Sequence, residues 1–227
     1  MTQPSREVPA ARQPSGRQMI LTMGAIGFVC GLLIVLTFQL TFPVIQQNKA
    51  EALEKAVFEV VPGAVTKKVF SMDNGELVAV DREGAAKYYA CYDAENELVG
   101  VAVEAEGQGF QDVLRVIYGY SPSSSAIVGL KVLDSRETPG LGDKIEKDAR
   151  FRSNFDSLDV ALDIDSKQIT NPIVLVKHGE KTESWQVESI TGATISSRAI
   201  ATILKESTEV TVPVITSNLS VLKEGSQ

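Results

Sequence analysis

The sequence predicts an α+β protein: one N-terminal transmembrane helix, then a domain of antiparallel strands with packed helices. Three observations lead to this prediction. No charged residue occurs between Gln18 and Asn48. From residue 66 onward, short segments rich in Val, Ile and Tyr alternate with turn residues. After the last of these segments, the apolar residues over 196–206 recur at helical spacing.

Composition agrees with a folded domain. Hydrophobic residues make up 44% of the 227 residues and charged residues 22%, which is ordinary for a globular protein. The length suggests one or at most two domains. The net charge of −7 argues against a nucleic-acid partner, because phosphates require a basic surface.

The apolar stretch from Met19 to Val44 is long enough to cross a membrane, since a helix needs about 20 residues to do so. A cleavable signal peptide is the alternative, but its apolar core is shorter and ends at a small-x-small site. Here the stretch ends in Phe42 and Pro43. We therefore expect a retained anchor over residues 19–45, in contact with membrane lipid.

Charge around the anchor predicts its orientation. Arg6, Arg12 and Arg17 precede it, and acidic sequence follows it. The positive-inside bias makes residues 1–18 a cytoplasmic tail and places the following domain across the membrane. In a bacterium this is a single-pass protein of the cytoplasmic (inner) membrane with a periplasmic domain. Gly27 and Gly31 have a spacing that permits close contact with a partner helix.

The soluble domain is expected over residues 46–213, followed by a C-terminal tail over 214–227. A helix over 49–61 continues from the membrane segment and ends at Pro62-Gly63. The expected strands and helices are these: strand pieces over 66–81 around an Asp73-Asn74-Gly75 turn, a hairpin of 87–92 with 98–105, strands 114–120 and 126–133, a short helix over 144–152, a hairpin of 173–177 with 184–188 around His178-Gly179, and the helix 196–206.

Metal ligation is not expected. Structural zinc and iron–sulfur sites need several ligands at close spacing, whereas this chain has only Cys30, Cys91 and a single histidine, His178. Cys91 is interpreted as a small apolar side chain, and His178 as a surface residue of a turn.

Two segments carry candidate chemistry. The first is ETPGLG, residues 137–142, where Pro139-Gly140 marks a tight turn and two glycines let the backbone approach a planar or anionic group. Taken alone, it can also be an ordinary turn.

The second segment is SITGATISSR, residues 189–198, which joins a strand to a helix. Gly192 and Ala193 leave space beside Thr194, and the helix that follows directs free N–H groups toward that hydroxyl. Such a helix start suits a phosphate. The alternative is that Thr194 or Ser196 simply caps the helix.

Together, ETPGLG and TGAT about 50 residues later resemble the FMN-binding domain of redox-driven ion pumps. The resemblance covers most of residues 45–210, including GQGF at 107–110 and GLKVLDSRETPGLGDKIE at 129–146. It is nearest to the G subunit of the Rnf complex, an ion-translocating ferredoxin:NAD oxidoreductase. One departure is Tyr118-Gly119-Tyr120-Ser121-Pro122, where the family would have a more glycine-rich stretch.

The resemblance implies an antiparallel FMN-binding domain with FMN esterified through its phosphate to Thr194. It implies an electron-relay subunit of a translocase, with other membrane and peripheral subunits and a flavin transferase as partners. No catalytic residue or metal is expected. The other expected cofactor-binding residues are Thr191, Gly192, Ala193, Glu137, Thr138, Gly140, Leu141, Gly142, Lys144 and Ser196.

Three alternatives stay open from the sequence. The chain could resemble the C subunit of a Na⁺-translocating NADH:quinone reductase, it could be a membrane-anchored flavin redox sensor, or it could be a scaffold domain in which TGAT only caps a helix. Covalent flavin separates the last alternative from the others, and co-purifying redox subunits separate a relay from a sensor.

Overall fold

The computed structural model describes residues 15–73, 76–80, 88–163 and 167–224. The chain divides into two compact units, Met1–Ala50 and Glu51–Gln227. The predicted turn residues Asn74 and Gly75, as well as Arg6 and Arg12 of the N-terminal segment, lie outside the described residues.

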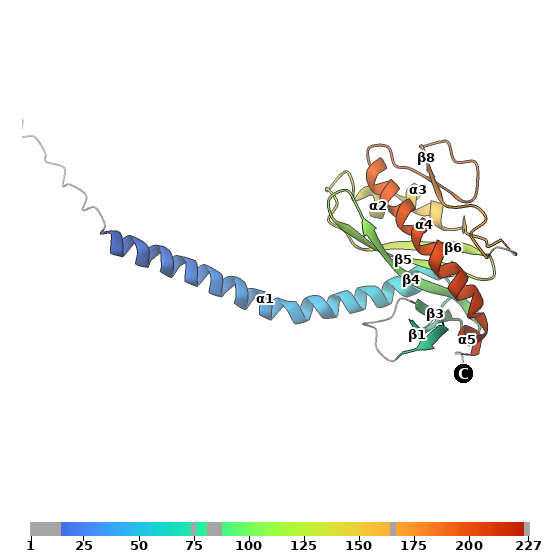
Figure 1. Cartoon of the computed structure of the whole chain (residues 1–227), viewed down its shortest axis with the longest axis horizontal. Helices are drawn as coiled ribbons and strands as arrows, with labels where there is room; N and C mark the ends of the chain where they lie inside the picture. Colours follow the sequence, from blue (N-terminus) through green and yellow to red (C-terminus); the bar gives the residue numbers. More distant parts are fainter. Residues whose placement is uncertain (1–14, 74–75, 81–87, 164–166, 225–227) are drawn as a thin grey trace, which may run out of the picture. The chain divides into compact units, whose positions relative to one another are not determined.

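Helix α1, Gly16–Val60, contains the predicted apolar segment and the predicted helix after it as one element (Figure 1). The large apolar side chains from Met19 to Ile45 are exposed. Among the described residues, α1 is the one helix whose length and composition suit a membrane span. An apolar helix surface of this kind is stable in lipid, because the helix satisfies its own backbone hydrogen bonds.

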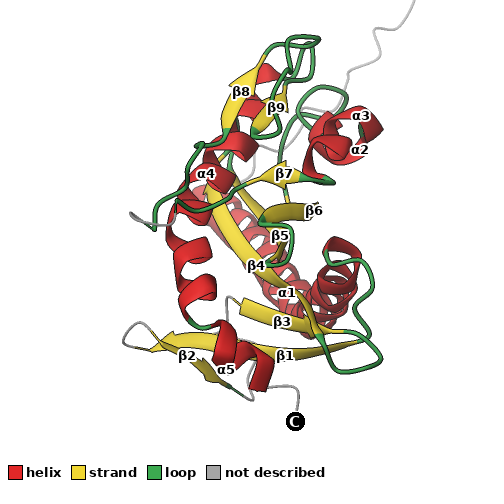
Figure 2. Cartoon of the chain, turned by 90° about the vertical axis from the view of Figure 1, so that its right-hand side faces the viewer, coloured by secondary structure: helices red, strands yellow, loops and turns green. Residues whose placement is uncertain are grey.

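The second unit is built on an antiparallel sheet, as predicted, with strand order β2-β1-β3-β4-β5-β6-β7 (Figure 2). Over the described residues, the predicted hairpin of 87–92 with 98–105 is confirmed by the antiparallel pairing of β3 with β4. The predicted strands 114–120 and 126–133 are also present, and they pair with each other as β5 and β6. The bounds are β1 Thr66–Asp73, β2 Glu76–Ala79, β3 Tyr88–Tyr92, β4 Leu98–Gln108, β5 Val113–Ser121, β6 Ala126–Asp134 and β7 Leu158–Asp159.

Both faces of the central strands are covered. In β3, Tyr88, Ala90 and Tyr92 belong to the larger core, whereas Tyr89 and Cys91 face the smaller one. Because side chains alternate between the two faces of a strand, β3 reads as a continuous run of buried residues. Helix α4, Thr194–Ser217, covers the first face, and the end of α1 covers the second.

Glycines in β5 and β6 admit the end of α1 closely against the sheet. A Cβ at Gly119 would lie 2.0 Å from the carbonyl oxygen of Val60, and one at Gly129 would lie 2.6 Å from it. Any side chain at these positions would displace the backbone of α1. The Tyr118-Gly119-Tyr120 segment thus keeps a glycine at the position where helix and strand touch.

Two short α-helices and one 3-10 helix follow strand β6 in the chain. Helices α2 (Lys144–Lys147) and α3 (Ala149–Arg152) replace the single predicted helix over 144–152, and η1 (Ser153–Phe155) follows. Asp148 ends α2 with extended backbone, and its carboxylate caps α3 by accepting from the N–H groups of Arg150 and Phe151. This cap explains why the chain forms two turns of helix instead of one helix.

The predicted hairpin of 173–177 with 184–188 is wrong. Strands β8 (Val174–Val176) and β9 (Gln186–Glu188) pair in parallel. The chain reverses twice between them: Glu180 N–H donates to the carbonyl of Lys177, and the Gln186 side-chain oxygen accepts from the N–H groups of Thr182 and Glu183. Side-chain acceptors therefore replace the ladder bonds that a hairpin would supply.

The tail expected over 214–227 also differs from the structure. Helix α4 continues past Pro213 to Ser217, and α5 follows over Leu219–Glu224. Ile215 and Leu222 are fully buried, and the hydroxyl of Tyr92 donates to the carbonyl of Leu222 at 2.7 Å. These residues are part of the larger core.

Candidate functional site

The two motif segments lie side by side in the fold. The hydroxyl of Ser196 donates to Oε2 of Glu137 at 2.5 Å, across 59 residues of sequence. A Cβ at Gly142 would lie 3.0 Å from the same hydroxyl oxygen. The turn after Glu137 and the start of α4 are therefore in direct contact.

The turn over 138–142 is closed by its own backbone. The carbonyl of Thr138 accepts the N–H groups of Leu141 (3.1 Å) and Gly142 (3.0 Å). Gly140 adopts φ +79°, a conformation that disfavours side chains. The closed turn leaves the Leu141 side chain 53% exposed, so an apolar group faces outward next to the start of α4.

Asp143 fixes this turn from its far end. Its Oδ1 accepts the N–H of Gly140 at 2.7 Å, and its Oδ2 pairs with the Lys147 ammonium at 2.6 Å. The hydrogen bond from Lys147 lowers the pKa of Asp143. Asp143 is therefore an ionised acceptor for the glycine N–H at neutral pH.

A second turn precedes α4. Ala193 N–H donates to the carbonyl of Ile190 at 3.0 Å, and Gly192 between them adopts φ +84°. The Ser197 hydroxyl holds the turn against the helix, because it accepts from Ile190 N–H at 3.1 Å and donates to the carbonyl of Ala193 at 2.9 Å. The position of Thr194 is thereby fixed from both sides.

Neither Thr194 nor Ser196 caps the helix. The cap residue is Ala193, and no side chain accepts a hydrogen bond there. Ser196 is turned toward Glu137, and Thr194 is exposed, with its hydroxyl 3.5 Å from the carbonyl of Ile190. The first N–H groups of α4 thus lack a side-chain cap, which leaves the positive end of the helix available to an anion.

Glu137 lies inside the site and not on its surface. Its side chain is buried at 6% exposure, and Oε1 accepts the N–H groups of Phe110 (2.7 Å) and Gln111 (3.2 Å). Because Oε2 is held by Ser196, both oxygens have partners within the protein. Glu137 therefore ties three segments together, and its carboxylate is not directed outward.

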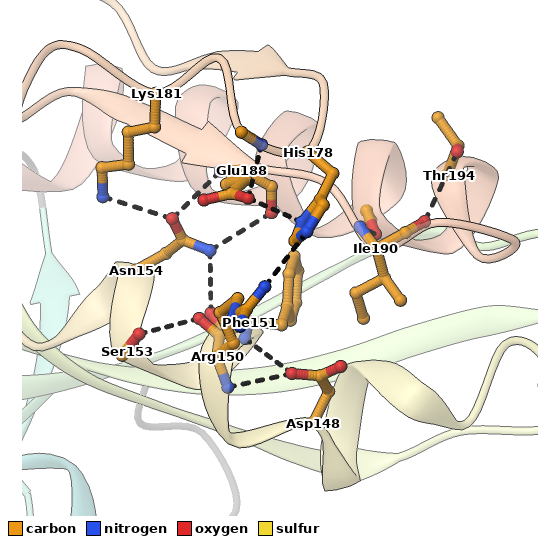
Figure 3. Close-up of polar contacts among 12 residues, drawn as sticks. Asp148, Arg150, Phe151, Ser153, Asn154, His178, Lys181, Glu188, Ile190 and Thr194 are labelled. Carbon is orange, nitrogen blue, oxygen red and sulfur yellow. Dashed lines mark hydrogen bonds and ion pairs between the residues drawn. The ribbon is translucent and has the colours of Figure 1, made fainter.

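A cleft of about 600 Å³ adjoins the second turn (Figure 3). Residues from α2, α3, the β8–β9 connection, β9 and the second turn line it, among them Lys144, Arg150, His178, Glu188 and Thr191. Its size lies within the range of small-molecule sites, about 300–1,000 Å³. Of the predicted cofactor-binding residues, Lys144 and Thr191 border this cleft.

His178 is at the surface, as predicted, but it is not isolated. Its Nδ1 lies 2.6 Å from Oε1 of Glu188, and its Nε2 lies 3.0 Å from Nη1 of Arg150 (Figure 3). An arginine can only donate, so Nε2 accepts and the proton is on Nδ1 in this arrangement. The imidazole thus joins α3 to β9 across the cleft.

Asn154 secures the wall of the cleft behind these groups. Its amide nitrogen donates to the carbonyls of Phe151 (3.0 Å) and Glu188 (3.2 Å), while its oxygen accepts from Glu188 N–H (3.0 Å) and the Lys181 ammonium (3.2 Å). The side chain is 4% exposed and fully satisfied. Sequence reasoning missed Asn154, because its main partners are 34 residues away and no local pattern indicates them.

Comparison with known proteins identifies the class of this domain. Residues 109–209 match the family model described as the FMN-binding domain. The fold is also that of the C subunit of a Na⁺-translocating NADH-quinone reductase from Parabacteroides distasonis, with 19% identity, a TM-score of 0.58, and coverage of 75% of this chain and 95% of that one. The sheet, the two turns and α4 thus define a flavin-binding domain attached to an apolar N-terminal helix.

Curated relatives make the assignment more specific. The chain is 32% identical to the G subunit of the ion-translocating oxidoreductase complex of Methanosarcina acetivorans over 82% of this chain and 89% of the relative. It is 25% identical to the G subunit of the proton-translocating ferredoxin:NAD(+) oxidoreductase complex of Clostridium ljungdahlii over 80% and 84%. The chain belongs to the family of G subunits of ion-translocating oxidoreductase complexes.

Proposed function

We propose that this chain is the electron-relay subunit of a membrane-bound, ion-translocating ferredoxin:NAD oxidoreductase, and that its FMN is esterified through the phosphate to Thr194. The names of the curated relatives support the redox-pump assignment. The match of residues 109–209 to the FMN-binding domain supports the cofactor.

The observation that carries the proposal is the exposed Thr194 hydroxyl at the first residue of a 24-residue helix without a side-chain cap. A phosphoester formed there would keep a negative charge next to the helix N-terminus, an interaction of about 0.3–1 kcal/mol. The residues therefore fit the phosphate of the cofactor. The bound flavin would supply the redox chemistry, while the chain positions it and adjusts its potential.

The surrounding residues have distinct proposed roles. Thr191, Gly192 and Ala193 form the turn that presents Thr194. The exposed Leu141 of the turn formed by Thr138, Gly140 and Gly142 would contact the flavin ring, and Lys144 would add positive charge near it. Glu137 and Ser196 are buried and hydrogen-bonded to each other, so they would support the site from within the protein.

We further propose that the flavin domain faces the periplasm, where a covalent bond prevents loss of a cofactor that could not be replaced. A flavin transferase would then transfer FMN from FAD to the Thr194 hydroxyl: the hydroxyl loses its proton and forms the phosphoester bond, while the pyrophosphate bond of FAD breaks and AMP leaves. The other subunits of the complex would donate and accept the electrons, with the anchor helix held among them in the lipid. The chain would supply no catalytic acid or base, because its role is to hold the flavin.

The test is covalent flavin on the full chain, expressed with its anchor and an active flavin transferase. Intact mass and in-gel fluorescence under denaturing conditions are measured for wild type, Thr194→Ala and Thr202→Ala. Thr202 is the matched control, because it is an exposed threonine of the same helix that lies outside the motif. We expect one FMN on wild type and Thr202→Ala and none on Thr194→Ala. An unmodified wild type would refute the covalent assignment, provided that the transferase modifies a control protein.

A further inference from the structure

Glu137 is unusual among the acidic residues of the site, because it is buried and its carboxylate joins separate segments of the chain. Oε1 accepts two N–H groups of the loop at Phe110 and Gln111, and Oε2 accepts the Ser196 hydroxyl of α4. The loop lies at least 26 residues before Glu137, and Ser196 lies 59 residues after it. A carboxylate can accept several such bonds at once, and bonds to a charged group are the stronger ones.

Two glycines make room for this carboxylate. A Cβ at Gly109 would lie 2.6 Å from Oε1, and a Cβ at Gly142 would lie 2.6 Å from Oε2. Both distances are shorter than real Cβ contacts. The loop and the turn therefore approach Glu137 as closely as glycine alone permits.

Ser196 transmits this arrangement to the attachment residue. It lies in the first turn of α4, two residues after Thr194, and is itself buried at 3% exposure. Ser197 fixes the other side of the same turn through Ile190 and Ala193. The orientation of the helix start relative to the turn that carries Leu141 thus depends on the Glu137–Ser196 bond.

We infer that Glu137 is a positioning residue: it holds the start of α4, and with it Thr194, in register with the Thr138–Gly142 turn and the loop at Phe110. It would not touch the flavin. The effect on flavin geometry rests on the proposed attachment at Thr194, whereas the effect on the helix start does not.

The experiment compares Glu137→Ala, Glu137→Gln and Ser196→Ala in the full chain, with Glu209→Ala as the matched control. Glu209 is an exposed glutamate on the same helix, away from its start. Glutamine can still accept the two loop N–H groups and can donate to the Ser196 oxygen, so it tests geometry apart from charge. Circular dichroism and thermal unfolding select conditions in which every variant is folded.

The first readout is hydrogen exchange without flavin, at the amides of Ser197 to Ile200. Loss of a hydrogen bond to a charged group predicts about tenfold faster exchange or more in Glu137→Ala and Ser196→Ala. Glu137→Gln is expected to restore most of the protection, and Glu209→Ala to match wild type. Wild-type exchange at these amides in both Glu137→Ala and Ser196→Ala would overturn the inference, whether or not the chain carries flavin.

The second readout is made on flavin-loaded protein. Fluorescence anisotropy and the absorption spectrum of the bound flavin report how firmly it is held, and its reduction potential reports its surroundings. We expect lower anisotropy and a shifted spectrum and potential in Glu137→Ala, with recovery in Glu137→Gln. Absence of flavin on wild type would refute the proposed function but leave the exchange result decisive for Glu137. Unchanged anisotropy, spectrum and potential in a loaded Glu137→Ala would overturn the positioning role.

Discussion

At the scale of single residues, polar groups buried in this fold are satisfied, and several of them join distant segments. Asn154 uses both its donor and its acceptor groups on backbone and lysine partners, and Glu137 uses both carboxylate oxygens. Among the described residues, no buried side-chain nitrogen or oxygen lacks a partner. Removal of one partner leaves the other buried and unpaired, which costs about 1–3 kcal/mol.

Cys91 is buried for a different reason. It lies in β3 against the end of α1, fully shielded, and its thiol donates weakly to the carbonyl of Tyr89 at 3.4 Å. Burial raises the pKa of this thiol from 9.0 to about 12. The side chain therefore behaves as the small apolar residue that the sequence predicts, and its thiol is poorly available as a thiolate.

This pKa predicts how stability depends on alkaline pH. The folded state keeps a proton that the unfolded thiol releases, so the contribution is fully present below pH 9 and is lost as pH rises toward 12. Relative to Cys91→Ala, wild type should lose up to about 1.4 kcal/mol per pH unit in this range. Unfolding of both full-length chains, followed by Trp185 fluorescence from about pH 8 to 11, measures the difference. If the unfolding free energies of the two chains changed with pH in parallel, the thiol of Cys91 would not be shielded in the folded state.

At the scale of elements, sequence patterns predicted the strands better than their connections. The antiparallel pairs of β3–β4 and β5–β6 follow from short apolar runs separated by turn residues. The parallel pairing of β8 with β9 does not, because the connection is bonded by the Gln186 side chain, and a period-2 pattern contains no information on strand direction. The same limit applies to the site: TGAT and ETPGLG were visible, whereas the Ser196–Glu137 bond between them was not.

The end of α4 shows a second limit. The helix was predicted over 196–206, yet α4 continues through Pro213 to Ser217 because tertiary packing of Val212 and Ile215 outweighs the one backbone bond that proline removes. Leu222 of α5 then closes the larger core beside Tyr92. The sequence beyond Val214 carries little signal, so it gave no indication of this packing.

Leu222 should therefore contribute strongly to stability. Leu222→Ala deletes a fully buried side chain and is expected to cost about 2–5 kcal/mol of unfolding free energy. Val221→Ala is the control, because Val221 is the neighbouring residue of the same helix and is 41% exposed. Chemical denaturation of the full chain compares the two variants. Equal losses of unfolding free energy in the two variants would mean that α5 is a tail outside the core, as the sequence suggested.

At the scale of the whole molecule, the surfaces of the two units suit different environments. Residues 19–45 expose apolar side chains over a length that suits lipid, while the unit from Glu51 onward has its own buried cores. Arg6, Arg12 and Arg17 precede the apolar segment, and the acidic excess follows it. The chain therefore combines an apolar N-terminal helix with a flavin-binding domain, which agrees with membership of a membrane redox complex.

The orientation is testable with single cysteines in a Cys30→Ala chain, where the shielded Cys91 should stay unlabelled. Ser124→Cys introduces an exposed thiol into the flavin domain, and Ser5→Cys introduces a thiol into the sequence before the anchor. Since positive charge favours the cytoplasmic side, a membrane-impermeant maleimide added to intact spheroplasts should label Ser124→Cys but label Ser5→Cys only after lysis. Inverted vesicles should give the reverse. Labelling of Ser5→Cys in intact spheroplasts would put the flavin domain in the cytoplasm and remove the argument that a covalent bond prevents loss of the cofactor.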